Sequence, residues 1–121
     1  MKYLLSIYAN TENWAILTPA EQEAIFAGHA AFQKEITDSG EFVYGAPLAD
    51  PGTAQTVTGR AGETRVVDGP FAESKEHLAG YYLVDCDSQQ RAVELAAKMP
   101  DTRIGNSIEV RALLDMGGQE M

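Results

Sequence analysis

The sequence predicts an α+β sandwich in which two helices cover one face of an antiparallel sheet. Two segments show helical periodicity, and short apolar segments with strand character lie before, between and after them. The resulting order, β-α-β-β-β-α-β, places each helix in a connection between strands. A chain of 121 residues is long enough for one hydrophobic core, so we expect residues 1–121 to form a single domain.

The first predicted strand covers residues 3–8, and the first helix follows it. Thr18 and Glu21 have the spacing of a capping box, with a proline between them at the first helical position, and Gly40 marks the end of the helix. One helical stripe contains Ile25, His29, Phe32 and Ile36. The imidazole of His29 is therefore expected on the apolar face of this helix.

The second half of the chain supplies the remaining elements. Residues 45–54 are rich in Gly and Pro and are predicted to form a loop, followed by a hairpin that turns near residues 60–62. Another strand is expected at 80–86, a second helix ends before Pro100, and the last strand covers 107–114. With both helices on one face, this pattern is typical of a ferredoxin-like sandwich that carries an added strand.

Composition excludes several classes of function. The formal charge of -9 repels phosphate backbones and anionic membrane surfaces, so we expect no direct contact with nucleic acid or membrane. No apolar run approaches the roughly 20 residues of a membrane-spanning helix. The single Cys86 forms no internal disulfide, and no Cys/His cluster has the spacing of a metal site. We expect a cytoplasmic protein that uses no metal or other cofactor.

Some predicted strands are apolar on both faces, although the helices cover only one. In the first strand Leu5 and Ile7 point to the face opposite Leu4 and Tyr8, and in a later strand Tyr81 and Tyr82 point to opposite faces. An uncovered apolar face usually marks a partner or a ligand site. We therefore expect a homodimer with facing sheets and a small-molecule cavity between them. The alternatives are a loop folded over this face, or ordinary exposed tyrosines.

A long interruption separates the predicted hairpin from the next strand. Asp68 ends the hairpin, and Gly69 and Pro70 force the chain to leave the sheet, after which Phe71 is expected to anchor the loop. Loops held at a sheet end often carry function. The alternative is a turn stabilised by Asp68 and followed by a solvated charged stretch. The residues that we expect to contact a ligand are Phe71, Lys75, His77, Tyr81 and Tyr82.

Four segments are distinctive together: MKYLLSIY, LTPAEQEAIFAGHAAFQKEITDSGEFV, VVDGPFAESKEHLAGYYLVD and IEVRAL. In combination they resemble the YCII-related family, in particular its DGPF-domain branch. The resemblance covers nearly the whole chain and implies a ferredoxin-like fold that dimerises and has no characterised biochemical function. It also implies a suspected enzymatic role for a His and an Asp, and a link to transcription through fusions of DGPF domains to sigma-factor-like proteins.

The resemblance carries over to individual residues only in part. His29 matches the histidine of the family's first helix, and Asp68 opens the DGPF signature. The suspected family Asp precedes a proline at the end of the second helix, where this chain has Met99 before Pro100, and Asp101 would substitute only from a shifted position. We therefore expect His29 and Asp68 to form a general acid/base pair for a small molecule. The alternative is a core histidine satisfied by a backbone carbonyl or a Tyr hydroxyl.

Two further functions stay open at this stage. One is a non-catalytic ligand-binding or interaction module beside a sigma-like protein, in which the acidic surface meets a basic partner. The other, by analogy of fold alone, is a cofactor-free oxygenase with Trp14, Tyr81 and Tyr82 in its cavity. Covalent catalysis is not indicated, because Ser74 lacks the strand-turn-helix setting of a hydrolase nucleophile.

Overall fold

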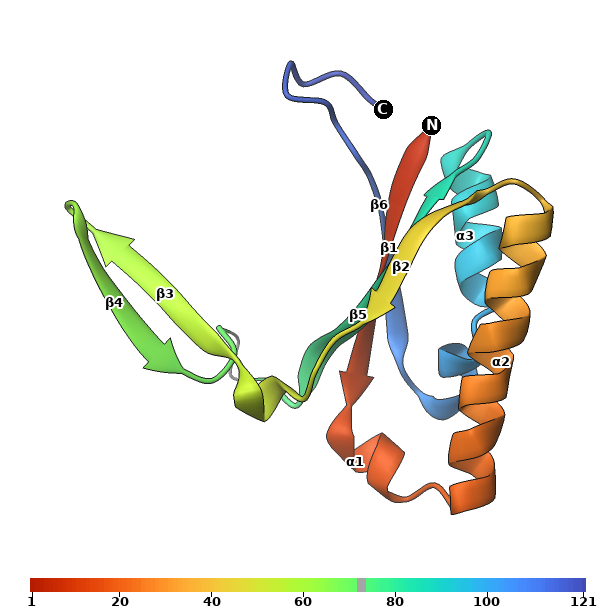
Figure 1. Ribbon diagram of the computed structural model, residues 1–121, viewed down its shortest axis with the longest axis horizontal. Coiled ribbons are helices and arrows are strands. Elements are labelled where there is room, and N and C mark those ends of the chain that lie inside the picture. The colour runs from red at the N-terminus through yellow and green to blue at the C-terminus, as the bar shows by residue number, and fades with distance from the viewer. Residues whose placement is uncertain (72–73) are drawn as a thin grey trace.

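The computed structural model describes residues 1–71 and 74–121 and has an antiparallel main sheet with helices on one side (Figure 1). Its strands are β1 (Lys2–Asn10), β2 (Phe42–Pro47), β5 (Glu76–Asp85) and β6 (Ser107–Ala112). They lie in the order β2-β5-β1-β6, and each neighbouring pair is antiparallel. This arrangement confirms the predicted α+β fold of ferredoxin-like type.

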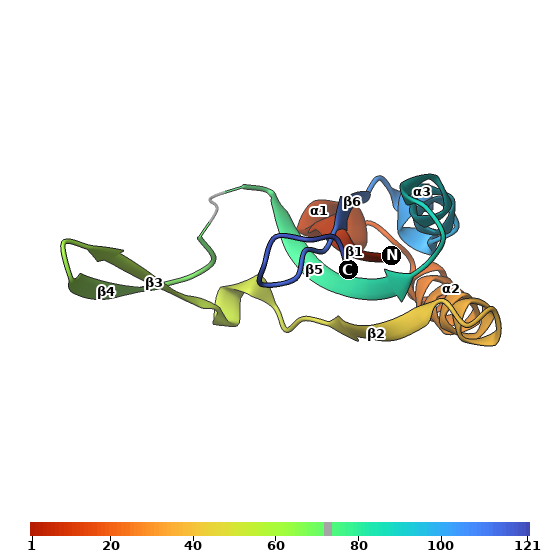
Figure 2. The ribbon, with the colours of Figure 1, turned by 90° about the horizontal axis from the view of Figure 1, so that it is seen from above.

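Two longer helices, α2 (Pro19–Asp38) and α3 (Gln89–Ala97), cover the same face of the main sheet (Figures 1 and 2). The predicted capping box is present: Glu21 N donates to Thr18 Oγ1 at 3.2 Å, and Thr18 N donates to Glu21 Oε1 at 3.0 Å. A short helix that the sequence did not predict, α1 (Thr11–Ala15), follows β1 directly. Within the described residues, no helix combines the length and the apolar character needed to cross a membrane.

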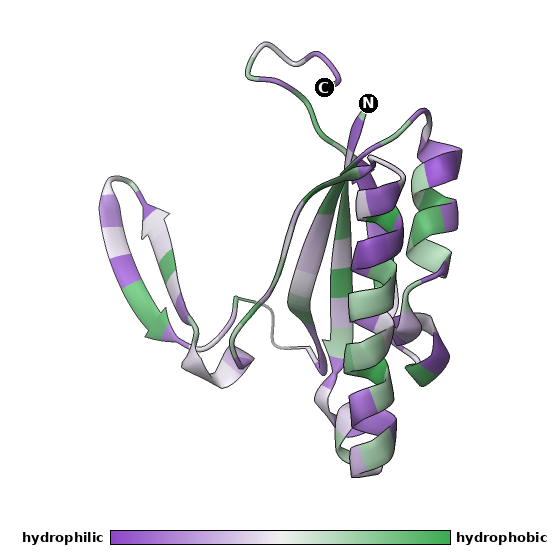
Figure 3. Ribbon diagram, turned by 45° about the vertical axis from the view of Figure 1, so that its right-hand side comes forward, coloured by the Kyte–Doolittle hydropathy of each residue, from purple (hydrophilic) through white to green (hydrophobic). Residues whose placement is uncertain are grey.

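The hydrophobic core lies between the main sheet and these two helices. Alternate residues of β1, among them Tyr3 and Leu5, point toward the helices, where they meet Phe32 and Ile36 of α2 and Leu95 of α3. Figure 3 shows hydrophobic residues along the strands of the main sheet and on the sides of the helices that face it. Large side chains therefore fill this part of the interior.

The predicted hairpin exists but does not join the main sheet. Strands β3 (Gln55–Arg60) and β4 (Glu63–Asp68) pair only with each other and project away from the rest of the chain (Figures 1 and 2). The turn between them has positive φ at Ala61 and Gly62, 54° and 85°, as a two-residue hairpin of type I′ requires. The hairpin therefore adds no strand to the sandwich, contrary to the expected added strand, and β2 occupies the sheet edge next to β5.

The predicted loop at residues 45–54 is wrong for its first three residues, which belong to strand β2. Gly45, Ala46 and Pro47 continue the strand and pair with β5, and only the residues after them form loop and the 3-10 helix η1 (Pro51–Thr53). Pro47 is tolerated because β2 is an edge strand and Pro47 is its last residue.

The face of the main sheet opposite the helices carries apolar and aromatic side chains. Leu4 pairs with Leu83 across β1 and β5, and the Tyr44 and Tyr81 rings lie 6.2 Å apart. Tyr44 is 57% exposed. This is the face that we expect to meet a second copy, and the homodimer stays a prediction.

Candidate functional site

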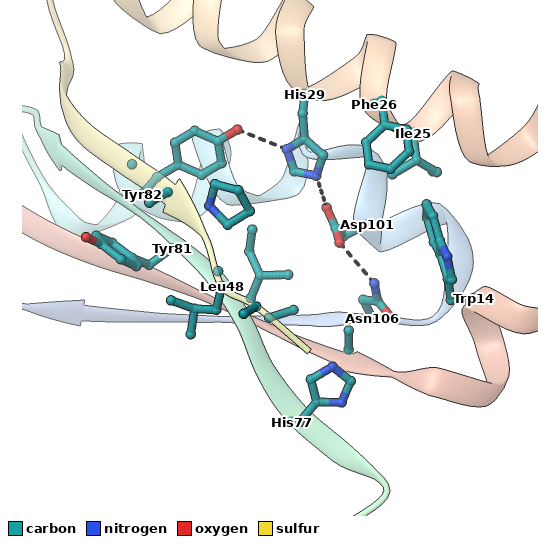
Figure 4. A pocket seen from close by; sticks show the side chains of 18 of the residues that line it. Trp14, Ile25, Phe26, His29, Leu48, His77, Tyr81, Tyr82, Asp101 and Asn106 are labelled. Atoms are coloured by element: carbon teal, nitrogen blue, oxygen red, sulfur yellow. Dashed lines mark hydrogen bonds and ion pairs between the residues drawn. The ribbon is translucent and has the colours of Figure 1, made fainter. Parts of the chain in front are cut away.

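A cavity of about 640 Å³ lies within one chain, on the helix-covered side of the main sheet (Figure 4). The middle of α2 forms its roof, the ends of β1 and β2 and the start of β5 form its floor, and α1 closes one side. Its larger apolar lining residues are Ile7, Trp14, Ile25, Phe26 and Leu48. The volume is in the range of small-molecule sites. Facing sheets in a homodimer would place a cavity on the sheet face that no helix covers. The cavity at His29 lies on the other face, beneath α2.

Small residues leave this space open. Beside its larger residues, the lining includes Ala9, Ala30, Ala46, Ala79 and Gly80. The pairing of β1 with β5 also shifts register between Ile7 and Tyr8. A Cβ on Gly80 would lie 3.0 Å from the Ala46 carbonyl oxygen, so glycine lets β2 approach β5 closely at the floor.

His29 projects from α2 toward the cavity and pairs with Asp101. The distance from His29 Nε2 to Asp101 Oδ1 is 2.5 Å. Asp101 belongs to the 3-10 helix η2 (Pro100–Ile104) and is only 6% exposed. Its second carboxylate oxygen accepts a hydrogen bond from Asn106 Nδ2 at 2.9 Å. Both oxygens of this buried carboxylate are therefore engaged.

The fold brings Asp101 under His29 because η2 begins at Pro100 and packs against α2. A Cβ on Gly28 would lie 3.0 Å from the Pro100 Cβ and Cγ, so the glycine next to His29 permits this close contact. Asp101 thus stands one residue after the proline rather than one before it, and it still reaches the imidazole. Asp101, which the sequence offered only as a substitute from a shifted position, is therefore the acid that pairs with His29.

The prediction that Asp68 pairs with His29 is wrong. Asp68 is the last residue of β4, on the projecting hairpin, where it is exposed and does not line the cavity. Its Oδ1 accepts a hydrogen bond from Gln55 Nε2 at 3.3 Å. The physical reason is topological, since β3 and β4 form their own sheet and carry Asp68 away from α2.

The other imidazole nitrogen contacts a phenol. His29 Nδ1 lies 3.0 Å from Tyr82 Oη, and the two rings are nearly parallel, with an interplanar angle of 17° and centroids 5.9 Å apart. Because the Asp101 carboxylate accepts from Nε2–H, a neutral imidazole leaves Nδ1 as the acceptor of the Tyr82 hydroxyl hydrogen. The sequence left open that His29 is a core histidine bonded to a Tyr hydroxyl, and that bond is present at Nδ1.

The surroundings set the protonation of the two flanking groups. Burial pushes the pKa of Asp101 upward, but the hydrogen bonds from His29 and Asn106 and the charge of His29 together lower it below its ordinary value. Burial, and then the Asp101 charge, raise the pKa of Tyr82. At neutral pH Asp101 is therefore a carboxylate and Tyr82 an intact phenol.

The predicted ligand-contacting residues separate into two groups. His77, Tyr81 and Tyr82 are among the lining residues, although the Tyr81 ring lies beside that of Tyr44 on the opposite face of the sheet. Figure 4 shows His77 on the side away from His29. Lys75 does not line it, and its ammonium lies 3.6 Å from a carboxylate oxygen of Glu12 on the surface. Phe71 is 85% exposed, so it does not anchor its loop in the core. It lines a neighbouring hollow, which shares Leu48 and His77 with the cavity.

Sequence reasoning missed Asn106, which fixes Asp101. Its side-chain oxygen is buried and has no hydrogen-bond partner among the described residues. No motif or periodicity marks this asparagine, because its role depends on the turn that follows η2. Among the described residues, no group of three or more His, Cys, Asp or Glu side chains is arranged to hold a metal ion.

Fold and site together define a class: a ferredoxin-like α+β protein with an apolar cavity and a buried carboxylate–imidazole pair at its wall. The profile of the YCII-related domain matches residues 1–117. An uncharacterized protein of Rhizobium meliloti (strain 1021) is 34% identical over 114 residues, which cover 93% of this chain and 92% of that protein. The chain belongs to the YCII-related family. Its assignment to the DGPF branch stays a prediction.

Proposed function

We propose that the protein binds a small molecule in this cavity and acts on it by general acid–base catalysis, with His29 and Asp101 as the proton-transferring pair. The observation that carries the proposal is the 2.5 Å contact between the imidazole and a buried, ionised carboxylate at the wall of an apolar cavity. Imidazole exchanges protons near neutral pH, and a fixed carboxylate stabilises the imidazolium that forms.

The surroundings support this role. Asn106 occupies the second oxygen of Asp101, which orients the carboxylate toward His29. The apolar lining keeps the pair in a medium of low dielectric, where its charges interact more strongly than in water. Proton transfer by a positioned side chain contributes about 10²- to 10⁴-fold to a rate. The reaction class supported is proton removal from, and return to, a carbon or oxygen of the ligand.

Solvent-deuterium exchange into a small aromatic ketone tests the proposal. Acetophenone fits the apolar character of the cavity, and NMR follows deuterium incorporation into its methyl group. We expect the wild-type protein to accelerate exchange and both His29→Gln and Asp101→Asn to lower the acceleration by about 10²-fold, because each change removes one partner of the pair.

Asp68→Asn is the matched control, since it removes the same charge from the hairpin. It is expected to leave the exchange rate unchanged. An equal loss in Asp68→Asn and Asp101→Asn would contradict the proposal. Binding of acetophenone without accelerated exchange would instead support a ligand-binding module without catalysis.

A further inference from the structure

Neither ring nitrogen of His29 is free to meet a ligand. Nε2 is bonded to Asp101 and Nδ1 to Tyr82, at 2.5 Å and 3.0 Å. The part of the imidazole that remains uncovered therefore presents carbon atoms. A proton that travels between a ligand and His29 has to pass through one of the two flanking groups, and Asp101 is turned toward His29 and Asn106.

Tyr82 is the flanking group that the fold holds in place at the cavity wall. Its ring packs edge-on against Phe32, with centroids 5.1 Å apart, and against Phe42 at 6.5 Å. A Cβ on Gly45 would lie 2.8 Å from Tyr82 Cδ1, so only glycine leaves room for the ring beside β2. Tyr82 is 8% exposed and lines the cavity. Its hydroxyl group is the end of the chain of hydrogen bonds that starts at Asn106.

The charges of the lining restrict the ligand. The described lining residues include Asp50 and Asp101 but neither Lys nor Arg, so a phosphate or a carboxylate would find no fixed counter-charge. Trp14, Ile25, Phe26 and Leu48 offer apolar and aromatic contacts instead. His77 adds one polar group on the side away from His29 (Figure 4).

We propose that Tyr82 is the residue that exchanges the proton with the ligand, and that the ligand is an uncharged, largely apolar ring compound with one acidic hydrogen. This inference rests on the proposed function and names the contacting residue and the ligand class of the same site. The ligand gives its proton to Tyr82 Oη while the phenolic proton moves to His29 Nδ1. The products are the conjugate base of the ligand, an unchanged phenol and an imidazolium that faces Asp101. The reverse transfers return the proton to the ligand.

The chemistry of the two flanking groups agrees with this relay. The raised pKa of Tyr82 keeps it protonated, so it passes a proton on without becoming a phenolate. The lowered pKa of Asp101 keeps a negative charge beside the imidazolium. No oxidant, reductant or further reactant is consumed.

Absorbance of bound 4-nitrophenol tests the relay, because this uncharged ring compound changes colour when it loses its proton. With the wild-type protein, we expect the phenolate-to-phenol ratio of bound 4-nitrophenol to be about tenfold larger than that of free 4-nitrophenol at the same near-neutral pH, where the imidazole can accept a proton. Tyr82→Phe is expected to abolish this increase. Tyr44→Phe, which removes a hydroxyl from the opposite face of the sheet, should leave it intact, and circular dichroism of each variant checks folding.

The outcomes separate the two proposals. If Tyr82→Phe keeps the increase while His29→Gln and Asp101→Asn lose it, the imidazole takes the proton directly; the relay is then overturned and the proposed function stands. If Asp101→Asn also keeps the increase, the proposed function fails as well. Absence of 4-nitrophenol binding to the folded wild-type protein would overturn the inferred ligand class.

Discussion

Two regions of the molecule each contain an acid that the sequence suggested as a partner of His29. The cavity beneath α2 contains Asp101, and the β3–β4 hairpin contains Asp68. These two carboxylates differ in burial and in hydrogen bonding. At the cavity, Asp101 is buried and both its oxygens are bonded. On the hairpin, Asp68 is exposed and its side chain accepts one hydrogen bond, from Gln55, at 3.3 Å. The more distinctive sequence motif thus lies in the more exposed region. A recognisable motif identifies the family, whereas packing between distant segments determines which acid reaches the histidine.

The largest expected effect is the difference in stability between a variant that lacks Asp101 and one that lacks Asp68. Asp101→Ala leaves the imidazole N–H of His29 and the Asn106 amide without a partner in a buried place, so we expect a loss of about 3 kcal/mol in the free energy of unfolding. Asp68→Ala should change it by less than about 0.5 kcal/mol. Urea denaturation followed by circular dichroism measures both. Similar losses in the two variants would contradict the claim that the buried carboxylate of Asp101 stabilises the fold more than the exposed carboxylate of Asp68.

Acid titration acts on the same carboxylate without a mutation. The pKa of Asp101 is lower in the folded chain than the unfolded value of about 3.9, so its contribution to stability is complete above that value and is lost as the pH falls through the folded pKa. We expect Asp101→Asn to flatten the fall in unfolding free energy below about pH 4 relative to wild type. A parallel pH dependence of Asp101→Asn and wild type would contradict this assignment, and Asp68→Asn serves as the control.

Gly45→Ala tests how β2 positions the phenol. The added Cβ would lie 2.8 Å from Tyr82 Cδ1 and 3.1 Å from the Tyr81 carbonyl oxygen, so the ring has to move. We expect a destabilisation of about 2 kcal/mol, as for other overpacked sites, and loss of the Tyr82–His29 hydrogen bond. Gly59→Ala on the hairpin is the comparison, because its nearest Cβ contact is 3.3 Å. Thermal unfolding measures both, and an equal cost at the two glycines would argue against a tightly fixed ring.

The smallest effects concern two ion pairs, one partly buried and one exposed. Arg91 binds Glu41 through two hydrogen bonds of 2.9 Å and joins α3 to the residue before β2, whereas Lys75 and Glu12 lie 3.6 Å apart and are exposed. We expect Glu41→Gln to cost about 1 kcal/mol and Glu12→Gln less than about 0.5 kcal/mol in unfolding free energy. Urea denaturation distinguishes them. A larger cost for Glu12→Gln would mean that the segment after the hairpin is held more firmly than the structure indicates.

Local signals in the sequence predicted much of the fold. The capping box at Thr18 and the apolar stripe through His29 act within one helix, and the hairpin turn near Gly62 depends on a few neighbouring residues. The strand at Phe42–Pro47 was missed because Gly45 and Pro47 have the composition of a loop, and only pairing with β5 makes this edge strand. The separation of the hairpin from the main sheet likewise depends on which strand occupies that edge.

The candidate site was predicted in part. His29 was found because it shares a helical face with apolar residues, and His77 and Tyr82 were found because they follow a motif at a sheet end. The partner Asp101 depends on a contact between Gly28 and Pro100, more than 70 residues apart in the sequence numbering, and on the turn that places Asn106. Neither contact leaves a local pattern in the sequence.

The ¹⁵N chemical shifts of the His29 imidazole measure the central claim, the pairing of His29 with Asp101, most directly. At neutral pH we expect the wild-type Nε2 to be protonated and to donate to a carboxylate, with a shift that changes in Asp101→Asn and stays unchanged in Asp68→Asn. A His29 spectrum that responds to Asp68→Asn and not to Asp101→Asn would contradict the account.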